Sequence, residues 1–134
     1  MKKIEDVRLP EELRYSPDHE WVAQEDELAR VGITDYAQDQ LGDVVYVELP
    51  SVGAHIAQRA VFATVESVKS VSDCYMPISG EVVAVNSPLV DNPALLNRSP
   101  YGDGWMILVK PDDPATVSQL LTAEAYRTRL KAGA

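Results

Sequence analysis

One lysine in this sequence stands apart as a residue that could carry chemistry. Lys69 is the only lysine between residues 4 and 109, and it lies in a stretch of small and β-branched residues, 65–71, between two expected strands. A tight turn there would present its primary amine, on a long flexible stem, to solvent. The position also suits an ordinary solubilising charge, and the isolation of the lysine does not decide between the two interpretations.

The remaining candidates for catalysis or metal binding are weak. Cys74 could serve as a nucleophile with His19 or His55, but no local catalytic signature surrounds it, and a buried cysteine in a strand is the alternative. Two histidines are too few for a metal site. The spacing of a calcium loop is absent from the aspartates near the C-terminus, Asp91, Asp103, Asp112 and Asp113. The glycines of 100–105 indicate a turn and not a phosphate-binding loop. We therefore predict no catalytic residue and no metal ligand.

The elements that must position Lys69 have to fit into 134 residues, the size of one domain. Hydrophobic residues make up 46% and charged residues 25%, values typical of a folded globular protein and not of a disordered chain. No apolar run approaches the roughly 18 residues that cross a membrane, and residues 1–6 do not resemble a secretory signal. The single cysteine excludes an internal disulfide and favours a reducing, intracellular setting.

Acidic residues are concentrated in one part of the chain. The formal net charge is −9, from 21 acids and 12 bases, and residues 11–48 carry the whole excess. Such a surface repels phosphates, so nucleic acid is excluded as a partner. The acidic segment is either a solvated face that keeps the protein in solution or a docking surface for basic partners.

Most of the chain is predicted to form short β-strands, with a helix at each of two places. Residues 20–23 and 28–33 flank a polar turn and predict a hairpin. Thr34 or Asp35 can cap a short helix that ends at Gly42, and Thr122 can cap a C-terminal helix. Further strands are predicted at 43–48, 61–65, 71–76, 81–85 and 105–109.

The strands include a weak internal repeat. Residues 42–47 and 80–85 share the pattern glycine, acid, valine, valine, any residue, valine, at an offset of 38 positions. Each copy is followed by a proline-containing loop and a second strand, at 61–65 and 105–109 respectively. Such a repeat predicts a two-fold pseudosymmetric sandwich or flattened barrel. Chance recurrence in a valine-rich β protein is the alternative.

Several motifs together resemble one known family. Residues 66–73, with Pro77 and Gly80, closely resemble the lipoyl-attachment region of glycine cleavage system H proteins. Three further blocks agree with that family in order and spacing: 19–22, 31–43 and 100–105. The resemblance extends from about Leu13 to the C-terminal helix and so covers nearly the whole chain.

The resemblance implies both a fold and a modification site. The implied fold is mainly β, a lipoyl/biotinyl-type barrel-sandwich hybrid with a pseudo-two-fold strand repeat, a short internal helix and C-terminal helices. Lys69 is then the residue to which lipoate is covalently attached. Glu66, three residues before it, and Gly80, eleven after it, recur in lipoyl-bearing proteins and are implied to serve lipoylation recognition. Biotin is disfavoured because Val68 and Ser70 stand where a biotinyl carrier has methionines.

By the same resemblance the chain is a carrier subunit and not an enzyme. Its lipoyl-lysine is implied to shuttle the aminomethyl group from glycine decarboxylase to the aminomethyltransferase and the dithiol to dihydrolipoyl dehydrogenase. A lipoate ligase or lipoyl transferase attaches the cofactor, and a cleft beside the 19–21 block and the 35–41 helix is expected to shelter the arm. The alternatives are an H-like protein that relays lipoyl groups to other complexes and a small enzyme that uses Cys74.

The expected organisation is simple. Residues 1–12 are predicted to be an N-terminal extension, and residues 13–134 a single lipoyl-bearing domain. The protein is expected to be a monomer, with no nucleic-acid or membrane partner. Because no transit peptide is recognisable before the first motif, we expect a bacterial cytoplasmic protein, or one of the mitochondrial matrix if the source is eukaryotic.

Overall fold

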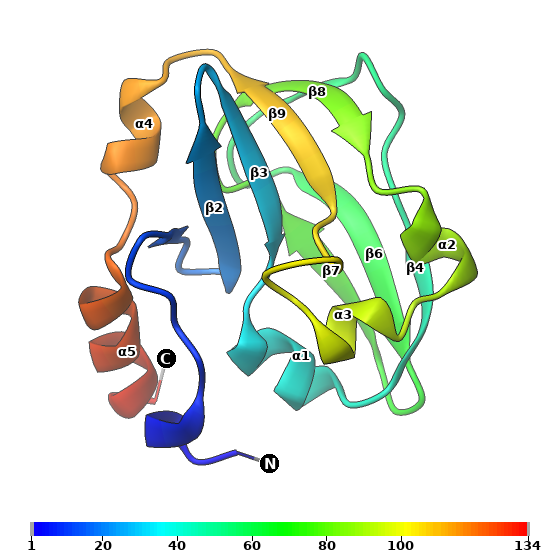
Figure 1. Ribbon diagram of the computed structural model, residues 1–134, viewed down its shortest axis with the longest axis vertical. Coiled ribbons are helices and arrows are strands. Elements are labelled where there is room, and N and C mark those ends of the chain that lie inside the picture. Colours follow the sequence, from blue (N-terminus) through cyan, green and yellow to red (C-terminus); the bar gives the residue numbers. More distant parts are fainter. Residues whose placement is uncertain (1, 134) are drawn as a thin grey trace.

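The computed structural model describes residues 2–133, which form two antiparallel sheets with short helices around them (Figure 1). The larger sheet has the strand order β1-β2-β3-β9-β8-β5, and the smaller sheet has the order β4-β6-β7. The strands are β1 (Arg14–Tyr15), β2 (Glu20–Glu25), β3 (Leu28–Ile33), β4 (Val44–Glu48), β5 (His55–Ile56), β6 (Val61–Ser67), β7 (Val71–Tyr75), β8 (Gly80–Val85) and β9 (Ile107–Pro111). The helices are η1 (Ile4–Asp6), α1 (Asp35–Leu41), α2 (Pro88–Asp91), α3 (Leu95–Arg98), α4 (Ala115–Ser118) and α5 (Ala123–Lys131). The predicted mainly β class is confirmed.

The two sheets enclose the main hydrophobic core between them. Both contribute fully buried side chains, among them Val31 of β3, Val65 of β6, Val82 of β8 and Ile107 of β9. Branched side chains suit these strands because they pack well on a pleated surface that is buried on one side. Within the described residues the sheets stay separate and do not close into a barrel, so the expected barrel-sandwich hybrid takes the form of a sandwich.

The strand repeat is confirmed by the way its two copies pair. β4 pairs antiparallel with β6, and β8 pairs antiparallel with β9, so each copy joins the second strand predicted downstream of it. Each pairing contains a register shift, between Val44 and Tyr46 in β4 and between Val82 and Ala84 in β8. These positions are related by the same offset of 38 residues. The two halves therefore share a β-bulge as well as a sequence pattern.

Two helices begin where the sequence predicts. Thr34 caps α1 by accepting a hydrogen bond from the Ala37 amide, and Thr122 caps α5 by accepting one from the Ala125 amide. Gly42 ends α1 with φ 75° and ψ −158°, a conformation that is essentially restricted to glycine. α1 leads from β3 to β4 and lies at the same end of the molecule as the β6–β7 turn (Figure 1).

The structure differs from the predicted elements in a few places. The last strand is β9, which begins two residues later than expected because Asn86 holds the Trp105 carbonyl in the preceding loop. β1, β5, α2, α3 and α4 have no predicted counterpart, since elements of two to four residues are too short to show a hydrophobic period. No helix within residues 2–133 is long and apolar enough to cross a lipid bilayer.

A second, smaller core lies between the N-terminal segment, the first strands of the large sheet and α5 (Figure 1). Tyr15 stacks on Tyr126 with ring centroids 5.0 Å apart, and Val7 is buried in the same cluster. Trp21 completes this core, and its indole N–H donates to the Pro100 carbonyl at 2.9 Å. Part of the segment predicted to be an extension is therefore packed against the body of the protein.

Candidate functional site

Lys69 lies at the tip of the hairpin that β6 and β7 form, and its side chain is exposed. The Ser67 amide closes the turn by donating to the Ser70 carbonyl at 2.8 Å. The Ser67 hydroxyl accepts hydrogen bonds from the amides of Lys69 at 3.3 Å and Ser70 at 3.1 Å. One buried serine thus holds the backbone of the tight turn, which the sequence predicts, while the lysine side chain projects from it.

The segment that follows α1 supports this turn from the side. The Val68 amide donates to the Asp43 carbonyl at 3.0 Å. Gly42 lies against the stem of the lysine, since a Cβ added to it would come within 3.4 Å of Lys69 Cε. Within residues 2–133, no acidic side chain forms an ion pair with Lys69. The amine is therefore presented on a supported turn without a charged partner.

Of the two residues predicted to serve lipoylation recognition, the structure brings only one to the lysine. Glu66 lies one residue before the turn, on β6, where it pairs with Tyr46 of β4 and Val71 of β7, and it is partly exposed. Gly80 begins β8 in the other sheet, at a distance from the hairpin tip (Figure 1).

Gly80 instead has a clear packing role. A Cβ at this position would lie only 2.5 Å from the carbonyl oxygen of Lys110 and 2.5 Å from a methyl group of Val109, both on β9. Its φ is not in the left-handed region, so close approach of two strands, and not an unusual backbone conformation, requires glycine here. The close approach of β9 explains why a glycine stands here, and the role of Gly80 in lipoylation recognition stays a prediction.

A cleft of about 210 Å³ opens beside the Lys69 turn, between β7, the start of β2 and α1. Ser70 of the turn forms part of its wall. The other lining residues are Asp18, His19, Glu20, Ile33, Tyr36, Ala37, Gln40, Leu41, Ser72, Asp73 and Cys74. The structure therefore brings the 19–21 block and the 35–41 helix together at one cleft. Trp21 is the exception, because its side chain packs in the second core.

Glu20 is the most unusual residue of this cleft, because its carboxyl is almost fully buried. It accepts a hydrogen bond from the Ser16 hydroxyl at 2.7 Å and one from the Tyr75 amide at 3.3 Å. Burial raises the pKa of Glu20 to about 8, and these hydrogen bonds oppose the rise only in part. Sequence reasoning did not single out this residue, although an acid next to Trp21 and Val22 in an apolar strand is a signal for it.

We expect Glu20→Gln to change how stability depends on pH. Between the ordinary pKa near 4.5 and the raised value near 8, the unfolded chain loses the Glu20 proton while the folded chain keeps it. The free energy of unfolding of the wild type therefore falls as pH rises through this window. Each pH unit in this window lowers the free energy of unfolding of the wild type by about 1.4 kcal/mol. The free energy of unfolding of the variant, relative to that of the wild type, should therefore rise by roughly 2–4 kcal/mol between pH 5 and pH 8.

Urea unfolding at the two pH values measures this gain, with Glu27→Gln as the control because Glu27 is exposed. The control should follow the wild type at both pH values. A Glu20→Gln protein whose stability relative to wild type is the same at pH 5 and pH 8 would show that the folded Glu20 is already ionised.

His19 lines the same cleft and has a constrained backbone conformation. Its φ is 75°, which is uncommon for a residue with a side chain. Its Nδ1 lies 2.7 Å from the Tyr126 hydroxyl, which in turn lies 2.9 Å from the Thr34 hydroxyl. Its ring also packs on Tyr36 with centroids 4.9 Å apart, and burial lowers its pKa. The histidine therefore joins β2, α1 and α5 at one corner of the cleft.

The structure argues against a nucleophilic role for Cys74. Its thiol is buried on β7, and burial, together with the nearby Glu20 and Asp73, raises its pKa well above the usual range. A thiolate, which is the reactive form, is thereby disfavoured. Within the described residues no hydrogen bond joins Cys74 to a histidine, since His19 pairs with Tyr126 and His55 pairs with Asp112 on the surface.

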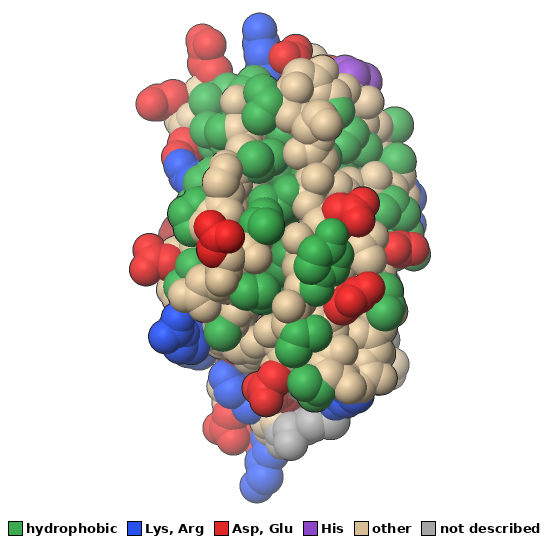
Figure 2. Space-filling view, turned by 90° about the vertical axis from the view of Figure 1, so that its right-hand side faces the viewer, with side chains coloured by type: hydrophobic (Ala, Val, Ile, Leu, Met, Phe, Trp, Pro, Cys, Tyr) green, Lys and Arg blue, Asp and Glu red, His purple; other side chains and the backbone are tan. Residues whose placement is uncertain are grey.

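The acidic segment 11–48 does not form a single face. Glu20 and Asp35 are buried, and the turn between β2 and β3 carries a separate group of exposed acids. Glu48 lies on β4 with exposed hydrophobic neighbours, and Figure 2 shows hydrophobic and acidic side chains interspersed on the side of the molecule where β4 lies. Any docking surface near Lys69 is therefore mixed in character and not purely acidic.

The fold and the site together define the class of protein. Two strand pairs of the same construction form a sandwich, and a lysine is presented at the tip of one hairpin, which is the arrangement of the lipoyl/biotinyl-type fold. The sequence model of the family described as "Glycine cleavage H-protein" matches residues 13–133. The chain belongs to the glycine cleavage H-protein family.

Comparison with individual proteins agrees with this assignment. The chain is 56% identical over 127 residues to a glycine cleavage system H protein of Geobacillus sp. (strain WCH70), covering 95% of this chain and 100% of that protein. It is 54% identical over 120 residues to the one of Bacillus subtilis (strain 168), covering 90% and 94%. The crystal structure of a glycine cleavage system H protein from Mycobacterium marinum superposes with a TM-score of 0.84 at 41% identity, over 92% of this chain and 99% of that one.

Proposed function

We propose that this protein is the lipoyl-lysine carrier of a glycine cleavage system, with lipoate attached to Lys69 as an amide. The observation that carries the proposal is the place of Lys69, an exposed primary amine on a turn that Ser67 holds rigid. The chain would carry an aminomethyl group from glycine decarboxylase to the aminomethyltransferase and then a dithiol to dihydrolipoyl dehydrogenase. It would act as a carrier subunit and not as an enzyme.

The residues around Lys69 fit such a group. Its neighbours in the turn, Ser67 and Ser70, are small, and Gly42 has no side chain to crowd the lysine stem. No acid within residues 2–133 pairs with the amine and competes with its acylation. When bound, the lipoyl group supplies a dithiolane ring, whose chemistry the partner enzymes use. The protein supplies a tether, which raises the effective concentration of that ring at a docked partner.

The cleft beside the turn gives this carrier a place to shelter its arm. Ser70 and Ser72 provide a polar approach from the turn, while Leu41 and Ile33 exclude water deeper in. Glu20 lies in the wall with a carboxyl that is easily protonated or ionised near neutral pH, because its pKa is about 8. A cationic amine beside it would favour the ionised form and donate a charge-assisted hydrogen bond to its carboxylate. Glu20 can thus hold an amino group away from solvent.

We expect Glu66→Gln to slow lipoylation. Glu66 is the acid closest in sequence to the turn and is partly exposed on the side of the smaller sheet, where a modifying enzyme would contact it. Loss of one interfacial charge should lower kcat/KM of a lipoate ligase roughly tenfold. The measurement is the initial rate of lipoate transfer, with Glu48→Gln as a matched control on β4. Equal rates for the two variants would leave Glu66 without a role in recognition.

The wider setting follows from the same proposal. We infer that residues 13–134 act as a single monomeric lipoyl-bearing domain, with residues 1–12 as an extension. A lipoate ligase or lipoyl transferase would load it, and bacterial relatives support a place in a bacterial cytoplasm. Neither nucleic acid nor a membrane is needed for this role.

Reconstitution with the three partner enzymes tests the function. The lipoylated protein should support NADH formation that depends on glycine and tetrahydrofolate, and the unmodified protein should not. A lipoylated protein that supports no glycine-dependent turnover with active partners would overturn the proposal and favour the relay of lipoyl groups to other complexes.

A further inference from the structure

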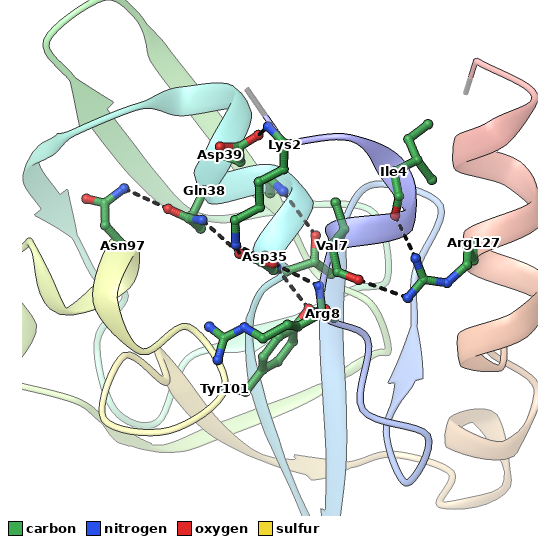
Figure 3. A network of polar contacts seen from close by, with 12 residues as sticks. Lys2, Ile4, Val7, Arg8, Asp35, Gln38, Asp39, Asn97, Tyr101 and Arg127 are labelled. Atoms are coloured by element: carbon green, nitrogen blue, oxygen red, sulfur yellow. Dashed lines mark hydrogen bonds and ion pairs between the residues drawn. The ribbon is translucent and has the colours of Figure 1, made fainter.

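The N-terminal segment 2–9, called here the strap, is bound to the body of the protein at several points (Figure 3). Arg127 of α5 donates to the carbonyls of Ile4 at 2.6 Å and Val7 at 2.9 Å. The Tyr101 hydroxyl donates to the Arg8 carbonyl. The strap lies outside the part of the chain that the family model matches, which begins at residue 13. It is thus an ordered feature that the family assignment does not explain.

The strap contacts a buried acid, Asp35, at the start of α1. The Asp35 side chain is 0% exposed, yet the Lys2 ammonium lies 2.9 Å from both of its oxygens. The Arg8 amide donates to it at 2.9 Å, and the Gln38 amide group donates at 2.8 Å. Burial by itself would raise the pKa of Asp35, but the hydrogen bonds from Arg8, Lys2 and Gln38 outweigh it and hold the pKa below its usual range. Two of these three partners belong to the strap.

A continuous set of hydrogen bonds leads from Asp35 to the Lys69 turn. Gln38 donates to Asp35 through its Nε2 and accepts a hydrogen bond from Asn97 Nδ2 at 3.0 Å through its Oε1. Asn97 then binds both sides of the segment that follows α1, since it donates to the Gly42 carbonyl at 2.8 Å and accepts from the Val44 amide at 2.9 Å.

That segment is the one that supports the hairpin tip. Asp43 accepts the hydrogen bond from the Val68 amide, and Gly42 lies against the stem of Lys69. The opposite side of α1 carries Tyr36, Ala37, Gln40 and Leu41 into the wall of the cleft. α1 is thus held between the strap on one side and the cleft on the other.

We propose that Lys2 is a positioning residue, which braces α1 through Asp35 and thereby fixes both the cleft wall and the Gly42–Val44 segment beneath the Lys69 turn. A buried carboxylate is stable only while it is paired and hydrogen-bonded. Without the Lys2 ammonium, Asp35 has to move toward water, and α1 has to move with it. The functional meaning of this brace rests on the proposed role of Lys69, but its physical test does not.

Amide hydrogen exchange on the full, unmodified chain tests the brace, with Lys2→Met compared with Lys3→Met. Both changes remove one positive charge from the same segment, but the Lys3 side chain is exposed and has no hydrogen bond or ion pair within residues 2–133. The amides of Gly42, Val44 and Val68 report on the supporting segment and the turn. We expect them to exchange roughly tenfold faster in Lys2→Met, the effect of losing a charged hydrogen-bond partner, and at the wild-type rate in Lys3→Met.

The Met106 amide, which donates to Val31 within the large sheet, separates positioning from general destabilisation. It should exchange at the wild-type rate in both variants. Equal acceleration at Met106 and Val68, an unchanged Val68, or the same pattern in Lys3→Met would each overturn the proposal. Because no lipoate is involved, a failure of lipoylation leaves this result unaffected.

Asn97→Ala tests the route itself. In that background, adding Lys2→Met should accelerate the Val68 amide by less than about twofold, since the connection is already broken. A second full tenfold acceleration would show that Lys2 acts on the turn by some other path, and the brace as described would be wrong.

Discussion

Lys69→Arg is expected to abolish carrier activity while leaving the fold intact. Arginine keeps the length and the charge of the side chain, but its guanidinium stays protonated at any physiological pH and does not accept an acyl group. Lys69 is exposed and forms no ion pair within residues 2–133, so its loss should change the free energy of unfolding by less than about 0.5 kcal/mol. Glycine-dependent NADH formation in the reconstituted system should fall to the background seen without any carrier.

The matched control for this change is Lys110→Arg, which alters another exposed lysine, on β9, in the same way. It should retain the full glycine-dependent rate. Substantial turnover with Lys69→Arg, or a similar loss in the control, would mean that the amine of Lys69 is not the group that carries the substrate.

Gly42→Ala is expected to reduce both stability and lipoylation. The φ of 75° and ψ of −158° place Gly42 in a region that is nearly closed to residues with a Cβ, so alanine should lower the free energy of unfolding by about 1–3 kcal/mol. The backbone can relieve this strain only by shifting at the segment that holds the Val68 amide and contacts the Lys69 stem. Urea unfolding and the initial rate of lipoate transfer measure the two effects.

Gly53→Ala separates the two effects. Gly53 also has a positive φ, of 95°, but a Cβ there would meet nothing within 4 Å, and it lies in the loop before β5. We expect this control to lose stability and to keep the wild-type rate of lipoate transfer. If Gly42→Ala is lipoylated as fast as the control, the contact between Gly42 and Lys69 has no part in presenting the lysine.

Much of the fold could be predicted because local chemistry and tertiary packing agree. Thr34 and Thr122 are strong helix caps, and both begin helices in the structure. The glycine-acid-valine-valine repeat predicted two equivalent strand pairs, and Val44 and Val82 do begin matching β-bulges. The turn around Lys69 could be predicted because small residues separate two β-branched runs.

The parts that could not be predicted depend on contacts between distant residues. Gly80 is required by the approach of β9, which no local pattern records. Glu20 and Asp35 counted in the sequence as members of an acidic surface, but Ser16 and Lys2 provide partners that allow them to be buried. The cleft has the same origin, since its wall combines β2, α1 and β7, and only the folded chain brings them together.

The assignment of Lys69 is tested most directly by mass spectrometry of the protein after incubation with a lipoate ligase, lipoate and ATP. We predict a single lipoyl increment on the intact wild-type protein, located by peptide mapping on the peptide that contains Lys69, and no increment on Lys69→Arg. An increment on another lysine, or none on correctly folded wild-type protein with an active ligase, would contradict the proposal that Lys69 carries the lipoyl group.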